Sequence, residues 1–339
     1  MVTRHLRMAD FDYPLPDAAI AQVPLEPRDA ARLLVAIDPA GGVSHRHVRD
    51  LPELLAPGDL LVVNDTRVLP ARLRLRKRSG GAAEVLLLEP IGPTRDHWEA
   101  LVRPARRIPP GTVLTDERGT PVVAIGERTG DGSTRQVRLL AEVGSCGEVP
   151  LPPYVHEQLR DPERYQTVYA DRPGSVAAPT AGLHLTEGVI DACRARGIGF
   201  ATVELAVGLD TFRPVTVEDP DDHPMHSEAY RVSDATWDAC AATRRDGGRV
   251  VAVGTTTARA LESVALGGGL EGRTELFIRP PHRFAVVDVL LTNFHLPRST
   301  LLLLVEAFTG PRWRQLYGDA LADGYRFLSF GDAMLLSRA

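Results

Sequence analysis

The chain has 339 residues, of which 44% are hydrophobic and 24% are charged, and its net charge is −5. This length predicts two domains, or one large domain with an insertion, and the composition excludes a disordered or fibrous protein. The longest apolar run, residues 301–305, is far shorter than the roughly 20 residues of a membrane-spanning helix. Because the N-terminus also lacks the apolar core of a secretion signal, we expect a cytoplasmic protein without membrane contact.

Residues 60–63 form an apolar run that predicts a buried strand, and this run stops abruptly at Asn64, Asp65, Thr66 and Arg67. A turn with an Asx hydrogen bond is one explanation of these polar residues. A functional site is the other, because functional side chains tend to lie where elements end. The residues alone leave both explanations open.

The segment that follows is locally basic. Residues 60–150 carry 14 Lys and Arg against 11 Asp and Glu, a balance of +3, while the rest of the chain carries 25 against 33, a balance of −8. Leu and Arg alternate at residues 71–76, which predicts a strand with one leucine face and one arginine face. The arginine face meets either solvent or the phosphates of a nucleic acid. The candidates for phosphate contact are Arg72, Arg74, Arg76, Lys77 and Arg78.

Short apolar segments separated by Gly- and Pro-rich turns continue to residue 140 and predict a small β-barrel. Helical patterns begin after residue 150. The first, at 186–196, follows Thr186 as N-cap and ends at Gly197.

Strands predicted at 200–207 and 250–253 alternate with helices, and the second leads through a polar turn at 254–257 into a helix at 258–264. Strand, turn and helix in this order often surround a ligand site. We therefore predict an α/β (α+β) main domain with an inserted all-β barrel domain. The expected boundaries are 1–64 and 151–339 for the main domain and 65–150 for the barrel.

The cysteines and histidines give no metal signature. Cys146, Cys193 and Cys240 are far apart in the sequence and form no CxxC pair, so we expect reduced, buried thiols. His223 and His226 are close together, but no Cys or Asp completes a standard ligand set. We therefore predict no metal site.

Two further segments hold catalytic residue types. His184 follows a run of small residues, among them Thr180 and Gly182, just before a predicted helix, where a lone histidine is often structural. His226 and Glu228 alternate along an extended segment, so their side chains are expected to share one face.

The last polar segment follows an apolar strand at 290–292. That strand ends in Asn293, His295 and Arg298, before a Leu-rich helix that Ser299 or Thr300 would cap. Because helix N-termini attract anions, a substrate carboxylate or an RNA phosphate is expected nearby.

At these segments the sequence resembles the S-adenosylmethionine:tRNA ribosyltransferase-isomerase family of queuosine biosynthesis. The resemblance covers nearly the whole chain in order. Its motifs lie at residues 11–13, 20–22, 24–29, 64–68, 163–170, 178–184, 225–228, 254–256, 292–297, 325–327 and 331–334.

The resemblance implies that the ribosyl group of S-adenosylmethionine is transferred to 7-aminomethyl-7-deazaguanine at the wobble position of tRNA and isomerised to epoxyqueuosine, with release of adenine and methionine. It implies a monomer that binds tRNA with a GUN-type anticodon and needs no metal or cofactor beyond S-adenosylmethionine as substrate. The alternatives are an S-adenosylmethionine or nucleoside hydrolase on the same scaffold and a non-catalytic RNA-binding relative.

The resemblance also suggests roles for the polar residues. We expect His184 or His226 to act as base or acid, and Asp65 and Glu228 to contact the ribose or an amine. Arg67 or Arg298 is expected to bind the methionine carboxylate or a phosphate. The expected substrate-binding residues are Asn64, Arg67, Thr180, Gly182, Thr255, Thr256, Asn293, His295 and Arg298.

Two segments depart from the family pattern. Where the family usually has His-Val-Gly-Ala-Gly-Thr-Phe, residues 206–212 read Ala-Val-Gly-Leu-Asp-Thr-Phe, which removes a histidine and adds Asp210. Where the family tends to have Gly-Thr-Thr-Ser-Val-Arg, residues 254–259 read Gly-Thr-Thr-Thr-Ala-Arg, which keeps Arg259. A change of substrate specificity is expected only if the first loop touches substrate.

Overall fold

The computed structural model describes residues 6–38, 42–92, 96–129, 132–142, 146–208 and 215–339. The chain forms two compact units. The main unit comprises Met1–Thr66, Pro152–Arg172 and Ala178–Ala339, and the barrel unit comprises Arg67–Leu151 and Pro173–Ala177. Relative to the boundaries expected from the sequence, the barrel unit starts two residues later, ends one residue later and also takes up Pro173–Ala177.

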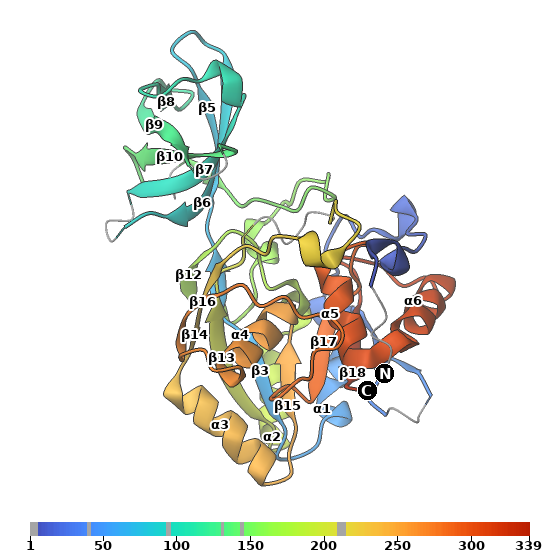
Figure 1. Ribbon diagram of the computed structural model, residues 1–339. Helices are drawn as coiled ribbons and strands as arrows, with labels where there is room; N and C mark the ends of the chain where they lie inside the picture. The colour runs from blue at the N-terminus through green and yellow to red at the C-terminus, as the bar shows by residue number, and fades with distance from the viewer. Residues whose placement is uncertain (1–5, 39–41, 93–95, 130–131, 143–145, 209–214) are drawn as a thin grey trace. The chain divides into compact units, whose positions relative to one another are not determined.

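The barrel unit is a closed antiparallel barrel of six strands within the described residues, coloured cyan to green in Figure 1. The pairing of β5 with β8 closes it, and β11 (Gly147–Glu148) pairs with β5 outside the ring. In ring order the strands are β5 (Arg72–Arg76), β6 (Ala82–Pro90), β7 (His97–Arg103), β10 (Thr134–Leu139), β9 (Pro121–Thr129) and β8 (Val113–Thr115).

Strand β5 shows the predicted alternation. Leu73 and Leu75 are buried in the barrel, whereas Arg74 and Arg76 are exposed and Arg72 is half-buried. The period-two pattern of the sequence therefore becomes one apolar and one basic face, because successive side chains of a strand point to opposite sides.

The main unit contains a mixed sheet of nine strands among the described residues (Figure 1). Its four central neighbours, β13, β3, β15 and β17, run parallel to one another. The order is β16 (Glu271–Thr274), β14 (Glu228–Val232), β13 (Gly199–Leu205), β3 (Leu60–Asn64), β15 (Val250–Val253), β17 (Val289–Asn293), β18 (Ala333–Ser337), β1 (Arg32–Ala36) and β2 (Ser44–His47). A separate two-stranded sheet pairs β4 (Thr66–Val68) with β12 (Arg172–Ser175).

Apolar side chains cover both faces of the central strands, which is why these strands read as continuous apolar runs. On one face Leu61 and Val251 pack with Val189 and Ile190 of α2 in a single buried cluster. Helix α4 packs on β13, β15 and β3, and α5 packs on β18. The helices are α1 (Leu51–Leu54), α2 (Glu187–Ala195), α3 (Asp234–Arg245), α4 (Thr255–Ala265), α5 (Thr300–Thr309) and α6 (Trp313–Ala322).

Helix starts follow their capping residues. The predicted helix at 186–196 is confirmed as α2, with the Thr186 hydroxyl accepting a hydrogen bond from the Val189 amide at 3.2 Å. The expected polar turn at 254–257 is wrong, because α4 already begins at Thr255. Gly254 alone makes the turn, at φ 89, a left-handed conformation that glycine adopts without steric cost.

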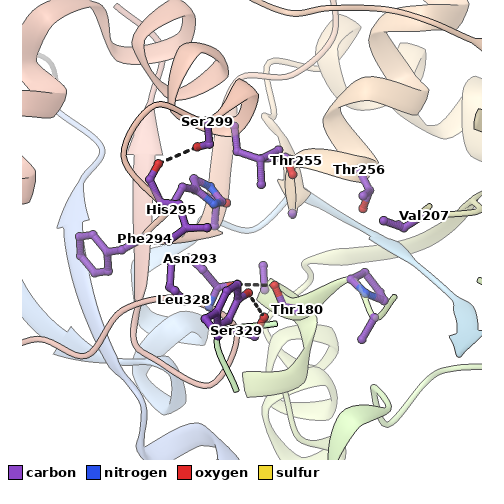
Figure 2. Close-up of a pocket in the computed structure, with 18 residues that line it drawn as sticks. Thr180, Val207, Thr255, Thr256, Asn293, Phe294, His295, Ser299, Leu328 and Ser329 are labelled. Carbon is purple, nitrogen blue, oxygen red and sulfur yellow. Dashed lines mark hydrogen bonds between the residues drawn. The ribbon is translucent and has the colours of Figure 1, made fainter. Parts of the chain in front are cut away.

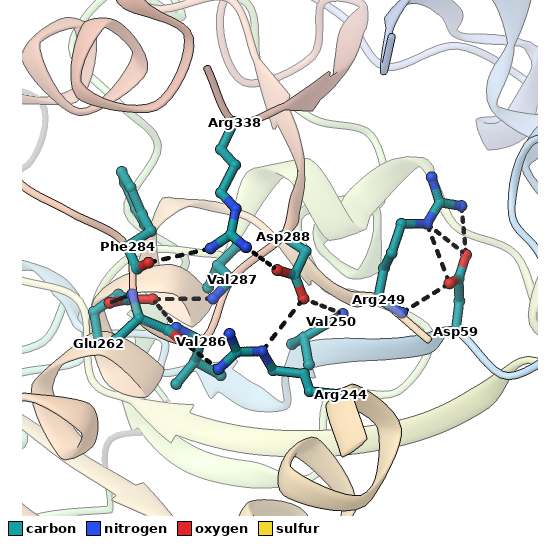
Figure 3. A network of polar contacts seen from close by, with 11 residues as sticks. Asp59, Arg244, Arg249, Val250, Glu262, Phe284, Val286, Val287, Asp288 and Arg338 are labelled. Carbon is teal, nitrogen blue, oxygen red and sulfur yellow. Dashed lines mark hydrogen bonds and ion pairs between the residues drawn. The ribbon is translucent and has the colours of Figure 1, made fainter. Parts of the chain in front are cut away.

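Two carboxylates, the buried Asp59 and the partly buried Asp288, connect loops that precede the strands (Figure 3). Asp59 pairs with Arg249 and also accepts the Arg249 amide at 3.0 Å. Burial by itself raises the pKa of Asp59, but the hydrogen bonds from Arg249 and Ala56 outweigh it and hold the pKa below its ordinary value. Asp288 likewise accepts the Val250 amide at 3.0 Å and pairs with Arg338 at 2.9 Å. These contacts fix β3, β15 and β17 side by side.

No helix among the described residues is long and apolar enough to cross a membrane.

Candidate functional site

Polar side chains gather where the parallel strands of the main unit end, the usual place of a ligand site in such sheets. Two cavities lie there. Cavity 1, of about 60 Å³, is shown in Figure 2 and joins the segments after β13, β15 and β17 to the segment around Thr180. Its polar lining consists of Tyr154, Thr180, Thr255, Thr256, Thr292, Asn293, His295, Ser299 and Ser329.

A hydrogen-bonded chain leads from cavity 1 to a buried histidine. Thr180, on the cavity wall, donates from Oγ1 to Asn293 Oδ1 at 2.9 Å. The Asn293 amide in turn donates from Nδ2 to His184 Nε2 at 2.9 Å. Because Nε2 accepts this bond, the neutral His184 ring carries its proton on Nδ1. The histidine is thereby held in one tautomer and one orientation.

Both buried histidines of the site are neutral at pH 7. Burial, aided by Arg326 and Arg28, lowers the pKa of His184 to about 3. Burial alone lowers the pKa of His295 to about 3. The His295 ring bonds to Thr292 Oγ1 at 3.0 Å, and its backbone amide donates to the Tyr317 hydroxyl at 3.1 Å.

These pKa values predict a pH-dependent stability. Between pH 3 and about 6.5 the unfolded chain binds more protons at His184 and His295 than the folded protein does. The free energy of unfolding is therefore expected to fall as pH drops from 6.5, by up to roughly 1.4 kcal/mol per pH unit for each histidine. Urea unfolding between pH 5 and 7 tests this, because His184→Asn should flatten the slope. An equal slope in this variant would mean that folding does not lower the pKa of His184.

The Asn64 side chain makes four hydrogen bonds to other parts of the protein. Its Nδ2 donates to the Leu205 carbonyl at 2.9 Å and to Thr256 Oγ1 at 3.3 Å. Its Oδ1 accepts the amides of Thr66 and Leu205 at 3.1 and 3.3 Å. With both N–H donors and both lone pairs engaged, Asn64 lines neither cavity and instead joins the ends of β3 and β13 to the start of α4. Its expected contact with substrate stays a prediction.

Asp65 and Gly182 lie outside both cavities. Asp65 is 8% exposed, burial raises the pKa of its carboxyl, and its buried Oδ1 has no hydrogen-bond partner among the described residues. A Cβ on Gly182 would lie 1.9 Å from the hydroxyl of the partly buried Tyr169, so packing requires glycine there. Neither observation tests the expected roles of these two residues.

Cavity 2, of about 290 Å³, brings His226 and Glu228 together as their alternation predicted. Glu228 forms a buried ion pair with Arg259 and accepts the Gly208 amide at 3.3 Å. His226 is exposed at the rim. The other lining residues are Thr216, Val217, His223, Pro224, Met225, Leu276, Phe277, Ile278, Thr300, Leu301 and Leu304.

The other expected residues that line neither cavity are His184, Arg67 and Arg298. Arg298 adopts a left-handed backbone (φ 53), pairs with Glu218 and lines neither cavity. Arg67 begins the barrel unit. Of the altered loop, Ala206 to Gly208 are described, whereas Asp210 lies outside the described residues.

The basic stripe of β5 lies on the barrel surface. Arg74 pairs with Glu148 at 2.9 Å and Arg76 lies 3.9 Å from Glu117, and all four side chains are more than half exposed. Exposed pairs of this kind contribute little to stability and exchange readily for other anions. Phosphate contact by the stripe stays a prediction.

Several residues that line the cavities were not expected from the sequence, among them Tyr154, Ser329 and Arg259. Tyr154 and Ser329 both line cavity 1 and their hydroxyls lie 2.7 Å apart, although 175 positions separate them. Arg259 lines cavity 2, and the sequence pattern marked it only as part of a motif. Its burial beside Glu228, which the sequence pattern does not show, is what distinguishes it.

Among the described residues, no cluster of three or more His, Cys, Asp or Glu side chains could hold a metal ion.

Known proteins resemble this chain over its whole length. A family model described as "Queuosine biosynthesis protein" matches residues 8–336. A protein of Symbiobacterium thermophilum named S-adenosylmethionine:tRNA ribosyltransferase-isomerase is 51% identical, covering 98% of this chain and 100% of its own. A protein of Thermotoga petrophila with the same name is 46% identical with the same coverage. The crystal structure of a Thermotoga maritima S-adenosylmethionine tRNA ribosyltransferase covers 96% of this chain and 99% of its own, with 37% identity and a TM-score of 0.56.

Proposed function

Because this chain belongs to the S-adenosylmethionine:tRNA ribosyltransferase-isomerase family, we propose that cavity 1 is where the adenosine part of S-adenosylmethionine reacts. The enzyme transfers and isomerises the ribosyl group of S-adenosylmethionine in queuosine biosynthesis. In our proposal the acceptor is the aminomethyl group of 7-aminomethyl-7-deazaguanine at the wobble position of a GUN-type tRNA. The products are epoxyqueuosine, adenine and methionine, and the enzyme acts in the cytoplasm as a monomer.

The hydrogen bonds that link Thr180 to Asn293 and Asn293 to His184 support this proposal. The reaction needs a base to remove the proton from the carbon beside the sulfonium and an acid to assist the departure of adenine. It also needs hydrogen-bond partners for the ribose hydroxyls. The hydroxyl and amide groups of cavity 1 suit the uncharged, polar adenosine. With a pKa of about 3, His184 is a weak base and is suited to donate a hydrogen bond from Nδ1. His226, in cavity 2, is then the candidate for the base.

The requirement for RNA tests the reaction. We expect adenine release from S-adenosylmethionine only when an RNA with 7-aminomethyl-7-deazaguanine is present, and none with the same RNA carrying guanine. A hydrolase would release adenine without RNA, and a non-catalytic RNA-binding relative would release none under either condition. Either of these results would contradict the proposed reaction.

The basic stripe of β5 is proposed to contact the tRNA backbone. Replacing Arg72, Arg74, Arg76, Lys77 and Arg78 by Gln is expected to raise the Kd for tRNA and to flatten its salt dependence by roughly one unit of log–log slope for each phosphate that the variant no longer binds. Filter binding at several salt concentrations measures both. The matched control replaces the exposed Arg118 and Arg128 of the same barrel. An unchanged slope in the stripe variant would mean that this face only meets solvent.

A further inference from the structure

The two cavities differ in charge. None of the described residues that line cavity 1 is Asp, Glu, Lys or Arg. Cavity 2, by contrast, contains the carboxylate of Glu228 and the guanidinium of Arg259. S-adenosylmethionine has the same asymmetry, because its ammonium and carboxylate groups both lie at its amino-acid end, whereas its adenosine end is uncharged. The cavities therefore suit opposite ends of one molecule.

Arg259 has a donor available for a carboxylate. Its side chain is 9% exposed, its Nε donates to the Leu276 carbonyl at 3.1 Å, and its Nη1 donates to Glu228. Its Nη2 is buried and has no hydrogen-bond partner among the described residues. A buried donor without an acceptor is unfavourable, and the planar guanidinium fork matches the geometry of a carboxylate. A ligand carboxylate would satisfy this atom.

The remaining walls suit a methionine chain. Glu228 is 8% exposed and supplies the negative charge that an ammonium group needs beside Arg259. Met225, Leu276 and Phe277 give the cavity an apolar surface for methylene groups. Thr300, the first residue of α5, also lines the cavity, and a helix N-terminus favours a negative charge nearby.

The two cavities adjoin each other. Leu301 lines cavity 1 and cavity 2, and the successive residues Val207 and Gly208 line one each. The sulfonium of a ligand spanning both would lie near this shared wall, between an uncharged and a charged compartment. The volume of cavity 2, about 290 Å³, is close to the lower end of small-molecule sites, which start at roughly 300 Å³.

Resting on the proposed function, we infer that Arg259 binds the α-carboxylate of S-adenosylmethionine in cavity 2 and that Glu228 binds its α-ammonium group. These two residues thus select a zwitterionic amino-acid sulfonium over other adenosine derivatives. Arg259 thereby takes the place of Arg67 and Arg298 as the carboxylate partner. Arg298 is already paired with Glu218.

Three ligands and one conservative variant test this assignment. Calorimetry on the full chain compares S-adenosylmethionine, decarboxylated S-adenosylmethionine and methylthioadenosine, which has no amino-acid end. The wild type should bind the first at least about tenfold more tightly than the second, the scale of a hydrogen-bonded charge pair. Arg259→Lys keeps the charge but loses the fork, so this ratio should fall to about threefold or less. The affinity for methylthioadenosine should stay within about twofold of wild type.

The controls separate the possible failures. Arg231→Gln changes an exposed arginine of β14 outside both cavities and should keep the wild-type ratio. The inference is overturned if Arg259→Lys keeps the wild-type ratio of affinities for S-adenosylmethionine and decarboxylated S-adenosylmethionine. It is also overturned if Arg298→Gln, rather than Arg259→Lys, loses this preference. If Arg259→Lys does not fold, Glu228→Gln takes its place, and it should lose the preference for S-adenosylmethionine over its deaminated analogue. A wild type that releases no adenine with the acceptor RNA would instead overturn the proposed function, and the inference with it.

Discussion

Replacing His184 by Ala is expected to lower the turnover of adenine release by about 10²-fold or more, the scale found when a positioned hydrogen-bond donor is removed from an active site. Its ring is buried, accepts the Asn293 amide at 2.9 Å and is neutral because burial lowers its pKa to about 3. Alanine removes both the ring and the hydrogen bond that links it to cavity 1. The measurement is kcat at saturating S-adenosylmethionine and RNA.

A matched set of variants separates this role from a general loss of structure. His97→Ala removes an exposed histidine of the barrel and should leave kcat unchanged. Asn293→Ala interrupts the same hydrogen-bonded chain, so its loss should not add to that of His184→Ala in the double variant. The Asp65→Asn variant is expected to lose a similar factor. Near-normal turnover in both His184→Ala and Asp65→Asn would overturn the catalytic assignment, while the family would stand.

Replacing Glu262 by Ala is expected to reduce the free energy of unfolding by about 3 kcal/mol or more. The fully buried carboxylate accepts the amides of Ala285, Val286 and Val287 at 2.7, 2.9 and 3.0 Å (Figure 3). Alanine leaves the two buried amides of Val286 and Val287 without an acceptor, each at a cost of about 1–3 kcal/mol, and also removes the acceptor of the more exposed Ala285 amide. Domains are commonly stable by only about 5–15 kcal/mol, so the loss is severe.

Urea unfolding measures this effect at pH 7, where Glu262 is ionised. Burial alone raises the pKa of Glu262, but the nearby His282, whose Nε2 lies 3.6 Å from the carboxylate, and hydrogen bonds from three backbone amides outweigh it and hold the pKa below its ordinary value. Glu271→Ala, at an exposed position of β16, is the control and should change stability by less than about 0.5 kcal/mol. A loss below about 1 kcal/mol in Glu262→Ala would mean that water replaces the carboxylate.

Much of the fold was predictable from the sequence because strand alternation and helix caps are set by residues a few positions apart. The Leu and Arg alternation of β5 and the capping Thr186 of α2 are read within a few positions. The start of α4 was placed wrongly because three successive threonines are poor helix formers. The turn at Gly254 and packing on the sheet nevertheless start the helix at Thr255. Tertiary contacts override local propensity at that point.

The site was predictable only in part, for a similar reason. Polar residues directly after apolar strands, such as Asn293, do meet at one edge of the sheet, because parallel strands end there together. Tyr154 and Ser329 meet through the long-range path of the chain, which no local pattern encodes. Arg298 and Arg259 look equivalent in the sequence, yet one pairs with the exposed Glu218 and the other is buried in cavity 2. The two arginines are distinguished only by the burial of their side chains and by the carboxylates with which they pair in the folded protein.

The most direct test of the proposed function follows RNA mass and adenine together. The purified enzyme is incubated with S-adenosylmethionine and an anticodon stem-loop that carries 7-aminomethyl-7-deazaguanine. We expect one adenine to be released for each RNA that gains the mass of an epoxycyclopentanediol group. Adenine release without a mass gain, or no adenine release at all, would contradict the proposed transfer and isomerisation.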